Sequence, residues 1–566
     1  MNKRSPSAAV YGAGSVENTA KRCILKSMGF TDHELSGGPI VGIANAWSSI
    51  CPGHKNLREL AEYVRNGIYS AGGTAVEFGV TGSCDGLCDG EEVSACILPS
   101  RGAICDAIEL QVRSSQLDAV VLMGSCDKIV PGMLMAAARL DIPAILVNGG
   151  PMLGGTAFDG RKSDQTSADE AVGMYTVGAV TAEQIRALED LACPTVGSCS
   201  FLGTANTMCC LSEAMGMSLP GSALVPAVYA QRQRHAFEAG RAVCELARRG
   251  LGARRIITEE SVKNAVRVCQ AICGSTNAVM HLSAIAYEAE LKLDVMREFE
   301  QTYRSIPQTV RVNPAAKWDM EDFYRAGGIP RVMKTLEGSL FENALTCTGA
   351  TVRENLASAR FPYPANDEVI SPPGKPFRPE GSLAVLRGSL APDTAITKPG
   401  AFAPSLRLFR GRAHVFDSER EANEAILAGK IRDGEVVVIR YEGPKGGPGM
   451  REMYKPMKYL YGQGKATTTA LITDGRFSGT NNGCFVGHIS PEAADGGPIA
   501  LVRDGDGILI DVDNGRLELL VDEEELRRRR AEWKRPPQRA ASGYLRLYQA
   551  LALSGAQGAM IPCREL

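Results

Sequence analysis

The chain has 566 residues, which is too many for one ordinary hydrophobic core, so we expect at least two domains. Hydrophobic residues make up 44% and charged residues 22% of the chain, as is typical of a globular protein. The net charge of −2 gives no electrostatic basis for nucleic acid or an anionic membrane as a partner. We also expect no membrane span, because no run of about 18 apolar residues occurs.

The 17 cysteines are many for a chain of this kind. Secreted proteins that depend on disulfides are small and rich in loops, and this chain is neither. Residues 1–10 lack the apolar run of a signal peptide. We therefore expect a cytoplasmic protein with reduced thiols, most of them buried as small hydrophobic side chains.

The first part of the chain predicts strands that alternate with helices. Short apolar runs occupy residues 39–45, 75–80, 117–123 and 143–148, and helical spacing is found at 57–71, 103–112 and 132–140. Buried strands separated by amphipathic helices are typical of a parallel sheet covered on both faces. The sequence therefore predicts an N-terminal α/β domain, followed by mostly helical residues from 180 to 360.

A stretch rich in proline and glycine, 370–381, predicts the domain boundary, which gives domains 1–369 and 370–566. Beyond it, short strands are predicted at 434–440, 469–473, 498–502 and 508–512. The run Asp513-Asn514-Gly515 favours a hairpin. We expect a β-rich C-terminal domain, barrel-like or a sandwich, with a solvated helix at 523–530.

Three cysteines lie beside residues suited to other chemistry. Cys84 precedes Asp85, Cys126 precedes Asp127, and Cys199 lies in a run of small polar residues. Thiolates select iron–sulfur clusters and zinc, whereas carboxylates select magnesium and manganese. The first two pairs also follow predicted strands, where ligands gather in parallel sheets. This pattern predicts an enzyme in which a soft metal centre lies beside a hard divalent cation.

Lys128 follows Asp127 between apolar flanks, so it must reach solvent, pair with an acid or be chemically altered. Ser478 lies in a turn after the predicted strand 469–473, where a reactive serine and an ordinary turn hydroxyl are both compatible with the sequence. The glycine-rich loop 441–453 lacks the Gly-Lys-Ser/Thr ending of a phosphate-binding loop. Two acids of this loop, Glu442 and Glu452, are further candidate site residues, because the loop is expected to face the other domain.

The motifs together resemble the dihydroxy-acid dehydratase/6-phosphogluconate dehydratase family, over nearly the whole chain. The matching stretches are Cys126-Asp127-Lys128 with Pro131-Gly132, Gly203 to Met208 with Ser218 to Gly221, Gly274 to Val279, Tyr441 to Met450, Thr473 to Gly479 and Gly487 to Ala494. The resemblance implies an iron–sulfur cluster that three cysteines hold, with one iron left open to substrate. It also implies a Mg²⁺ ion, a small dihydroxy acid as substrate and a homodimer.

The resemblance also assigns roles to residues. Cys126 and Cys199 match two cluster ligands; Asp85, Asp127, Glu452 and a carbamylated Lys128 match the Mg²⁺ ligands; Ser478 matches the serine that abstracts a proton. The third cysteine is where the chain departs. Family members with a two-iron cluster have a Pro-Cys-Asn segment, and Gly53 takes the place of that cysteine here. The segment looks like members with a four-iron cluster, so the cluster type stays open. We prefer Cys84 as the third ligand, with Cys51 as the alternative.

The implied reaction removes water from a 2,3-dihydroxy acid and leaves a 2-oxo acid. The C-terminal motifs favour 2,3-dihydroxy-3-methylbutanoate and its homologue, which implies a role in valine and isoleucine synthesis. The alternative is a sugar-acid dehydratase, because Cys84-Asp85-Gly86 resembles phosphogluconate enzymes and Gly90-Glu91-Glu92 lacks a histidine that many relatives carry there. A non-catalytic iron–sulfur sensor is a third hypothesis, which the complete set of acids and Ser478 disfavours.

Overall fold

The computed structural model describes residues 6–12, 16–540 and 542–564. Its N-terminal part is built on a four-stranded sheet of β1 (Ile40–Asn45), β2 (Thr74–Gly79), β3 (Ala119–Met123) and β4 (Ala144–Val147). The strands lie in the order β2-β1-β3-β4, and every neighbouring pair is parallel. The predicted parallel sheet is thus confirmed.

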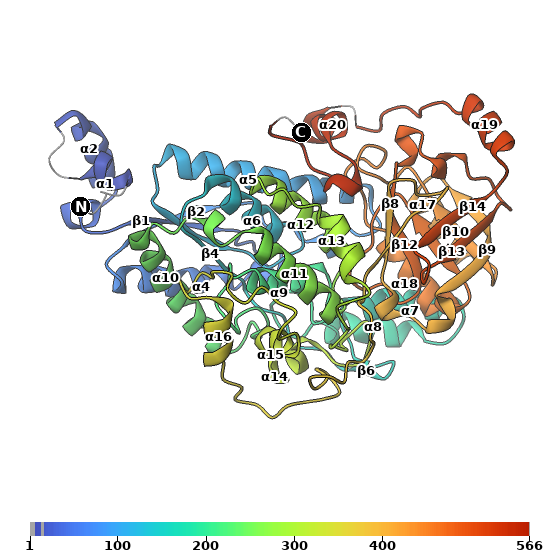
Figure 1. Ribbon diagram of the computed structural model, residues 1–566, viewed down its shortest axis with the longest axis horizontal. Coiled ribbons are helices and arrows are strands. Elements are labelled where there is room, and N and C mark those ends of the chain that lie inside the picture. Colours follow the sequence, from blue (N-terminus) through green and yellow to red (C-terminus); the bar gives the residue numbers. More distant parts are fainter. Residues whose placement is uncertain (1–5, 13–15, 541, 565–566) are drawn as a thin grey trace.

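Helices cover both faces of this sheet. The helices are α4 (Leu57–Ser70), α5 (Ile97–Ser114), α6 (Ile129–Leu140) and α10 (Ala230–Arg249). Figure 1 shows α5 and α6 on one side of the sheet and α4 and α10 on the other. Helix α4 buries Leu57, Leu60, Val64 and Ile68, which recur every three or four residues along one face. This apolar face packs against α10 and the strands, and the charged residues of α4 face solvent.

Further helices surround this core. They are α1 (Pro6–Tyr11), α2 (Thr19–Ser27), α3 (Asp32–Ser36), α7 (Gln165–Thr176), α8 (Ala182–Leu191), α9 (Thr204–Ala214), α11 (Glu259–Ile272), α12 (Asn277–Glu288), α13 (Val295–Thr302), α14 (Met320–Arg325), α15 (Gly328–Thr335) and α16 (Val352–Ser358), with a short ladder of β5 (Ala157–Phe158) and β6 (Arg161–Lys162). Helices α9, α11 and α12 are almost fully buried and belong to the same hydrophobic core as the sheet. No helix among the described residues is long and apolar enough to cross a membrane.

The C-terminal part is an eight-stranded mixed sheet. Its strands are β7 (Ala384–Leu386), β8 (Thr394–Thr397), β9 (Leu408–Phe416), β10 (Glu435–Ile439), β11 (Ala470–Thr473), β12 (Cys484–Ser490), β13 (Gly507–Asp511) and β14 (Arg516–Leu520), in the order β14-β13-β9-β10-β11-β12-β8-β7. Arg387, just after β7, pairs with Arg516 at the start of β14 and brings the two edge strands together. The predicted barrel-like architecture is confirmed.

Among the residues that the structure describes, four helices complete this part: α17 (Glu419–Leu427), α18 (Tyr454–Gly462), α19 (Glu523–Glu532) and α20 (Gly543–Leu551). The predicted hairpin at 513–515 and the helix after residue 523 are confirmed. The strand predicted at 498–502 is wrong, because Pro498–Leu501 forms one turn of 3-10 helix. Proline is well suited to begin such a turn, and a short buried apolar run does not reveal its own period.

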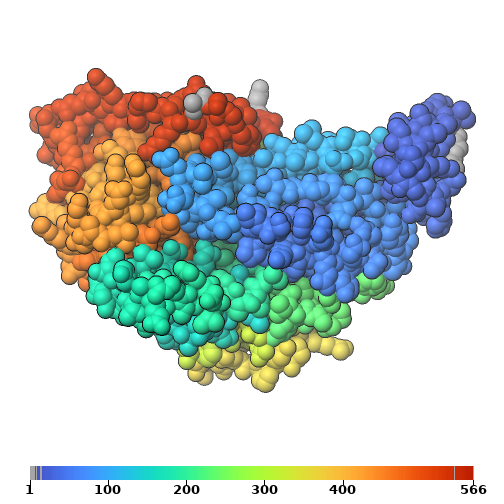
Figure 2. Space-filling view, turned by 180° about the vertical axis from the view of Figure 1, so that it is seen from behind, coloured from blue at the N-terminus to red at the C-terminus, as the bar shows by residue number. Residues whose placement is uncertain are grey.

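The two parts are packed directly against each other, as Figure 2 shows from behind. Helix α18 of the C-terminal part lies against α7 of the N-terminal part, where Lys458 and Glu170 form a buried ion pair of 2.9 Å. The end of the chain returns to the first part: the Arg101 guanidinium donates to the carbonyls of Gly558 and Ala559. Loops from both sheets therefore meet at a shared interface.

Candidate active site and metal centre

The carboxyl ends of the N-terminal strands define one side of the candidate site. Asn45, the last residue of β1, pairs in register with Gly79 of β2 and with Met123 of β3. The three strands therefore end at the same edge of the sheet, and the segments that follow them bring Cys51, Cys84 and Cys126 to that edge. This is the position in which parallel sheets hold their ligands.

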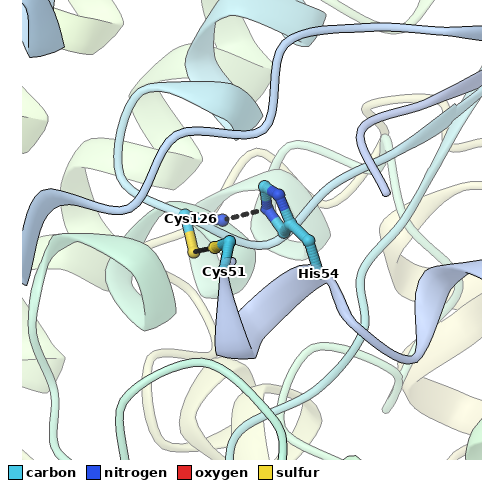
Figure 3. Close-up of side chains that lie close together, drawn as sticks. All are labelled: Cys51, His54 and Cys126. Carbon is cyan, nitrogen blue, oxygen red and sulfur yellow. Dashed lines mark hydrogen bonds between the residues drawn. The ribbon is translucent and has the colours of Figure 1, made fainter. Parts of the chain in front are cut away.

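These segments bring thiols together. The sulfur atoms of Cys51 and Cys126 lie 3.4 Å apart, and Figure 3 shows them pointing toward one another. Cys84 lies against the Cys51 thiol, and this contact, together with burial, raises the pKa of Cys84. Cys199 is close enough to Cys126 and Cys84 to interact with both electrostatically. The structure thus places both candidates for the third cluster ligand, Cys51 and Cys84, beside Cys126.

Cys199 reaches the site on an extension of the sheet. Ser198 pairs with Pro151, which follows β4, and the Ser198 hydroxyl donates to Asn206 in the first turn of α9. The Asn206 amide in turn donates to the carbonyls of Cys199 and Phe201. This network fixes the backbone on both sides of Cys199.

The buried thiols are held in their neutral form. The hydrogen bond with Cys51 lowers the pKa of Cys126. Burial and the neighbouring thiols raise this pKa by more, so that its net value is about 12. Burial raises the pKa of Cys199 well above its ordinary value. Metal binding removes the proton from a coordinating thiol, so these groups suit a strongly bound metal centre better than free nucleophiles.

His54 supports this cluster rather than joining it. Its Nε2 accepts hydrogen bonds from the backbone amides of Ser125, at 3.1 Å, and Cys126, at 3.2 Å. Although Cys51, His54 and Cys126 lie together as a potential metal-binding group, the Nε2 lone pair is already engaged. Burial lowers the pKa of His54 to about 4, so the ring stays neutral and remains an acceptor. Sequence reasoning missed this role, because it depends on loops about 70 residues apart meeting in space.

Gly53 allows two segments to approach each other closely beside the thiols. A Cβ atom at this position would lie 2.8 Å from the sulfur of Cys126 and 3.3 Å from the Cα of Ser198. Any larger residue would therefore intrude between the segments that carry Cys126 and Cys199. The glycine at the place of the cysteine in the two-iron relatives thus permits the close approach of these segments.

Three carboxylates converge next to the thiols. Ligand oxygens of Asp85, Asp127 and Glu452 lie within 4.8 Å of one another, although Glu452 belongs to the C-terminal part. The Lys128 amine lies among them: it bonds to Asp85 and is 3.2 Å from Asp127 and 3.5 Å from Glu452. The predicted lysine is therefore buried and paired with acids, and its burial alone does not call for a chemical modification.

Arg476 is a second cation at this cluster, and sequence reasoning did not single it out. Its guanidinium pairs with Glu452 and lies 4.0 Å from Asp85. The backbones of Glu452 and Arg476 also pair as parallel strands beyond the ends of β10 and β11. The only signal in the sequence was its place inside the motif Thr473 to Gly479. Glu442, the other candidate acid, is 3.3 Å from Arg451 and takes no part in this cluster.

Ser478 lies two residues beyond Arg476 on the loop after β11, and only 9% of it is exposed. The adjacent Gly479 packs against the backbone of Leu202 and Gly203, where a Cβ would come within 2.7 Å of the Leu202 carbonyl. The Lys398 amine donates to the Gly479 carbonyl at 2.6 Å. These contacts hold the Ser478 loop between the carboxylate cluster and the segment that follows Cys199.

Comparison with known proteins places this arrangement in a family. The model of the dihydroxy-acid/6-phosphogluconate dehydratase N-terminal domain matches residues 38–355, and the corresponding C-terminal model matches residues 368–559. The chain belongs to the dihydroxy-acid/6-phosphogluconate dehydratase family.

Individual relatives are similar to this chain over almost their full length. A dihydroxy-acid dehydratase of Pyrococcus furiosus is 48% identical over 96% of this chain and 98% of its own. Those of Caldanaerobacter subterraneus and Methanococcoides burtonii are 46% and 47% identical, over 96% and 95% of this chain and 97% of each relative. The resemblance that the motifs indicated is thus confirmed.

Proposed function

We propose that this dehydratase converts a 2,3-dihydroxy carboxylic acid to a 2-oxo acid, with 2,3-dihydroxy-3-methylbutanoate as its substrate. One observation carries the proposal: a cluster of three carboxylates and a lysine lies directly beside a group of thiols, at the meeting point of the two sheets. Relatives that match the whole chain are named dihydroxy-acid dehydratases. We therefore place the reaction at this interface.

The carboxylate cluster fits a Mg²⁺ ion. Asp85, Asp127 and Glu452 offer the hard oxygen ligands that this ion prefers. In the structure Lys128 and Arg476 pair with these acids, so the cluster already accommodates positive charge. Bound there, Mg²⁺ would supply the charge that holds the substrate carboxylate and acidifies the hydrogen at C2.

Lys128 is the candidate for a carbamate ligand. In this modification the neutral amine forms an N–C bond to CO₂ and releases one proton, so a cation becomes an anionic oxygen ligand. Support comes from the family resemblance and from the position of the amine among Asp85, Asp127 and Glu452. Mass spectrometry of the intact protein in bicarbonate, with Lys128→Arg as the control, would detect the added CO₂.

Cys84, Cys126 and Cys199 would hold the iron–sulfur cluster. Four thiols gather there, so the residues present fit such a group. The cluster would supply a Lewis acid for the hydroxyl that leaves from C3. The protein contributes fixed positions for Cys126 and Cys199 through His54 and Asn206.

Ser478 would remove the proton from C2. A serine is a weak base at its ordinary pKa, and nearby positive charge makes the alkoxide accessible. Arg476, on the same loop, and the proposed Mg²⁺ provide that charge. The C2–H bond would break as its proton passes to Ser478, the C3–O bond would break, and the departing hydroxide would take up that proton and leave as water; the enol then becomes the 2-oxo acid. No electrons are exchanged.

A sugar-acid dehydratase is the second candidate, and one observation favours it. Asp89 lies beside Asp85 and Glu452, and burial raises its pKa well above the ordinary value. A further carboxyl group at the edge of this cluster would offer a partner for an additional substrate hydroxyl. Glu91, at the position of the missing histidine, is 67% exposed and points toward Lys455, so it adds no comparable group.

Removing the Ser478 hydroxyl tests the proposed function. Ser478→Ala should lower 2-oxo acid formation by about 10²–10⁴-fold, the usual contribution of a general base. Its iron content and thermal stability should match those of the native chain. Ser358→Ala, at the end of α16, is the control and should retain full activity. A Ser478→Ala enzyme with undiminished turnover would refute this assignment.

The structure also bears on compartment and assembly. All 17 cysteines are free thiols, which supports the proposal of a reducing, cytoplasmic environment. The homodimer is proposed from the resemblance, and sedimentation of the purified protein would test it.

A further inference from the structure

The thiol cluster contains one sulfur more than the three proposed ligands. Cys51 lies between Cys126, whose sulfur is 3.4 Å away, and Cys84, whose thiol it contacts. It is 1% exposed, so no solvent separates it from the other two. The question is whether Cys51 is an ordinary core residue or part of the metal centre.

The distance between the sulfurs favours the metal centre. Metal–thiolate bonds of about 2.3 Å in a tetrahedral arrangement place two sulfurs on one metal about 3.8 Å apart. The 3.4 Å between Cys51 and Cys126 is near this value, so a small movement would let both bind one iron.

Other buried cysteines have different surroundings. Cys209 donates to the Ser125 carbonyl at 3.7 Å, and Cys244 to the Ile68 carbonyl at 3.8 Å, as expected of thiols in a protein core. The Cys51 thiol also donates to a carbonyl, that of Ser83, but at a longer distance of 4.0 Å. The closest polar partner of Cys51 is therefore another thiol of the cluster.

We propose that Cys51 is a fourth, displaceable ligand of the cluster, a proposal that rests on the cluster itself. In the substrate-free protein its thiolate would fill the open position on the iron that Cys126 binds. An S–H bond breaks, an iron–sulfur bond forms, and the proton goes to solvent without electron transfer. The substrate hydroxyl would then replace Cys51, and the filled coordination shell would protect the resting cluster from oxygen.

The test compares Cys51→Ala with Cys84→Ala and with Cys209→Ala, a buried cysteine beside the same loop. Each anaerobically reconstituted protein is measured for iron and sulfide per chain, for the electron paramagnetic resonance spectrum of the reduced cluster, and for the rate of iron loss in air. Thermal unfolding verifies that each variant is folded, and Cys51→Ser is used if the alanine variant is not.

We expect Cys51→Ala to retain the iron and sulfide of the native chain, to show an altered spectrum before substrate is added, and to lose iron severalfold faster in air. Cys84→Ala should lose most of its iron, and Cys209→Ala should match the native chain. A Cys51→Ala protein that matches the native chain in spectrum and iron loss would make Cys51 a core residue. Loss of the cluster in Cys51→Ala would make it an obligatory ligand, which also overturns the proposal. A native chain that takes up no iron or sulfide would refute the cluster itself.

Discussion

His54 offers a direct test of how the thiol cluster is held, because it makes two hydrogen bonds that nothing else in the loop replaces. We predict that His54→Ala destabilises the protein and loosens the segment that carries Cys126. The imidazole accepts from the amides of Ser125 and Cys126 and is fully buried. Without it, both amides remain inside the protein with no acceptor.

The magnitude follows from these two donors. A buried donor left without a partner costs about 1–3 kcal/mol, so the two amides should cost about 2–6 kcal/mol together. The loss of the ring leaves a cavity that adds to this figure. Urea denaturation of the apoprotein, monitored by circular dichroism, gives the change in unfolding free energy, and iron per chain after reconstitution gives the effect on the site.

His54→Gln should recover part of the loss, because its carboxamide oxygen can accept one of the two bonds. His414→Ala is the matched control: this partly exposed histidine lies on β9 and contacts Glu435 at 3.2 Å. It should change stability little. If His54→Ala cost less than about 1 kcal/mol and kept its full iron content, the amides would not depend on this ring, and our account of the loop would be wrong.

Two further predictions concern packing and pH. Gly53→Ala should retain the fold but lose reconstituted iron, because its methyl group would lie 2.8 Å from the Cys126 sulfur and would displace this ligand. Normal iron uptake would show that the close packing of Gly53 against Cys126 does not matter for the cluster. Burial raises the pKa of Glu419 to about 8, although the nearby Arg451 lowers it. The folded state therefore binds more protons than the unfolded state between the ordinary pKa and about 8, and unfolding free energy should fall by up to about 1.4 kcal/mol per pH unit as pH rises through that window. Glu419→Gln should remove this fall in urea titrations at several pH values, and an unchanged slope would refute the cause we assign.

Much of the site was predictable because a parallel sheet gathers its strand ends. Cys84-Asp85 and Cys126-Asp127 follow strands that the apolar runs marked, so their meeting at one edge follows from the fold class. Glu452 was indicated only by the motif that contains it. Its approach to Asp127 requires the two sheets to dock, and no local pattern encodes that contact.

Other features depend on tertiary contacts and could not be predicted. His54 gave no sign of its bonds to the loop after β3, and Arg476 looked like part of an ordinary turn. The apolar run at 498–502 suggested a strand, but Pro498 begins a helical turn there. The domain boundary at residue 370 and the choice of Cys84 over Cys51 stay predictions, because geometry alone decides neither.

The most direct test of the central claim is an anaerobic assay of the reconstituted protein with Mg²⁺. Formation of 2-oxo acid would be compared for 2,3-dihydroxy-3-methylbutanoate, gluconate, 6-phosphogluconate and arabinonate under identical conditions. We predict a strong preference for 2,3-dihydroxy-3-methylbutanoate. Preference for a sugar acid would contradict the assigned substrate and point to Asp89, and no 2-oxo acid from any of the four would contradict the proposed reaction.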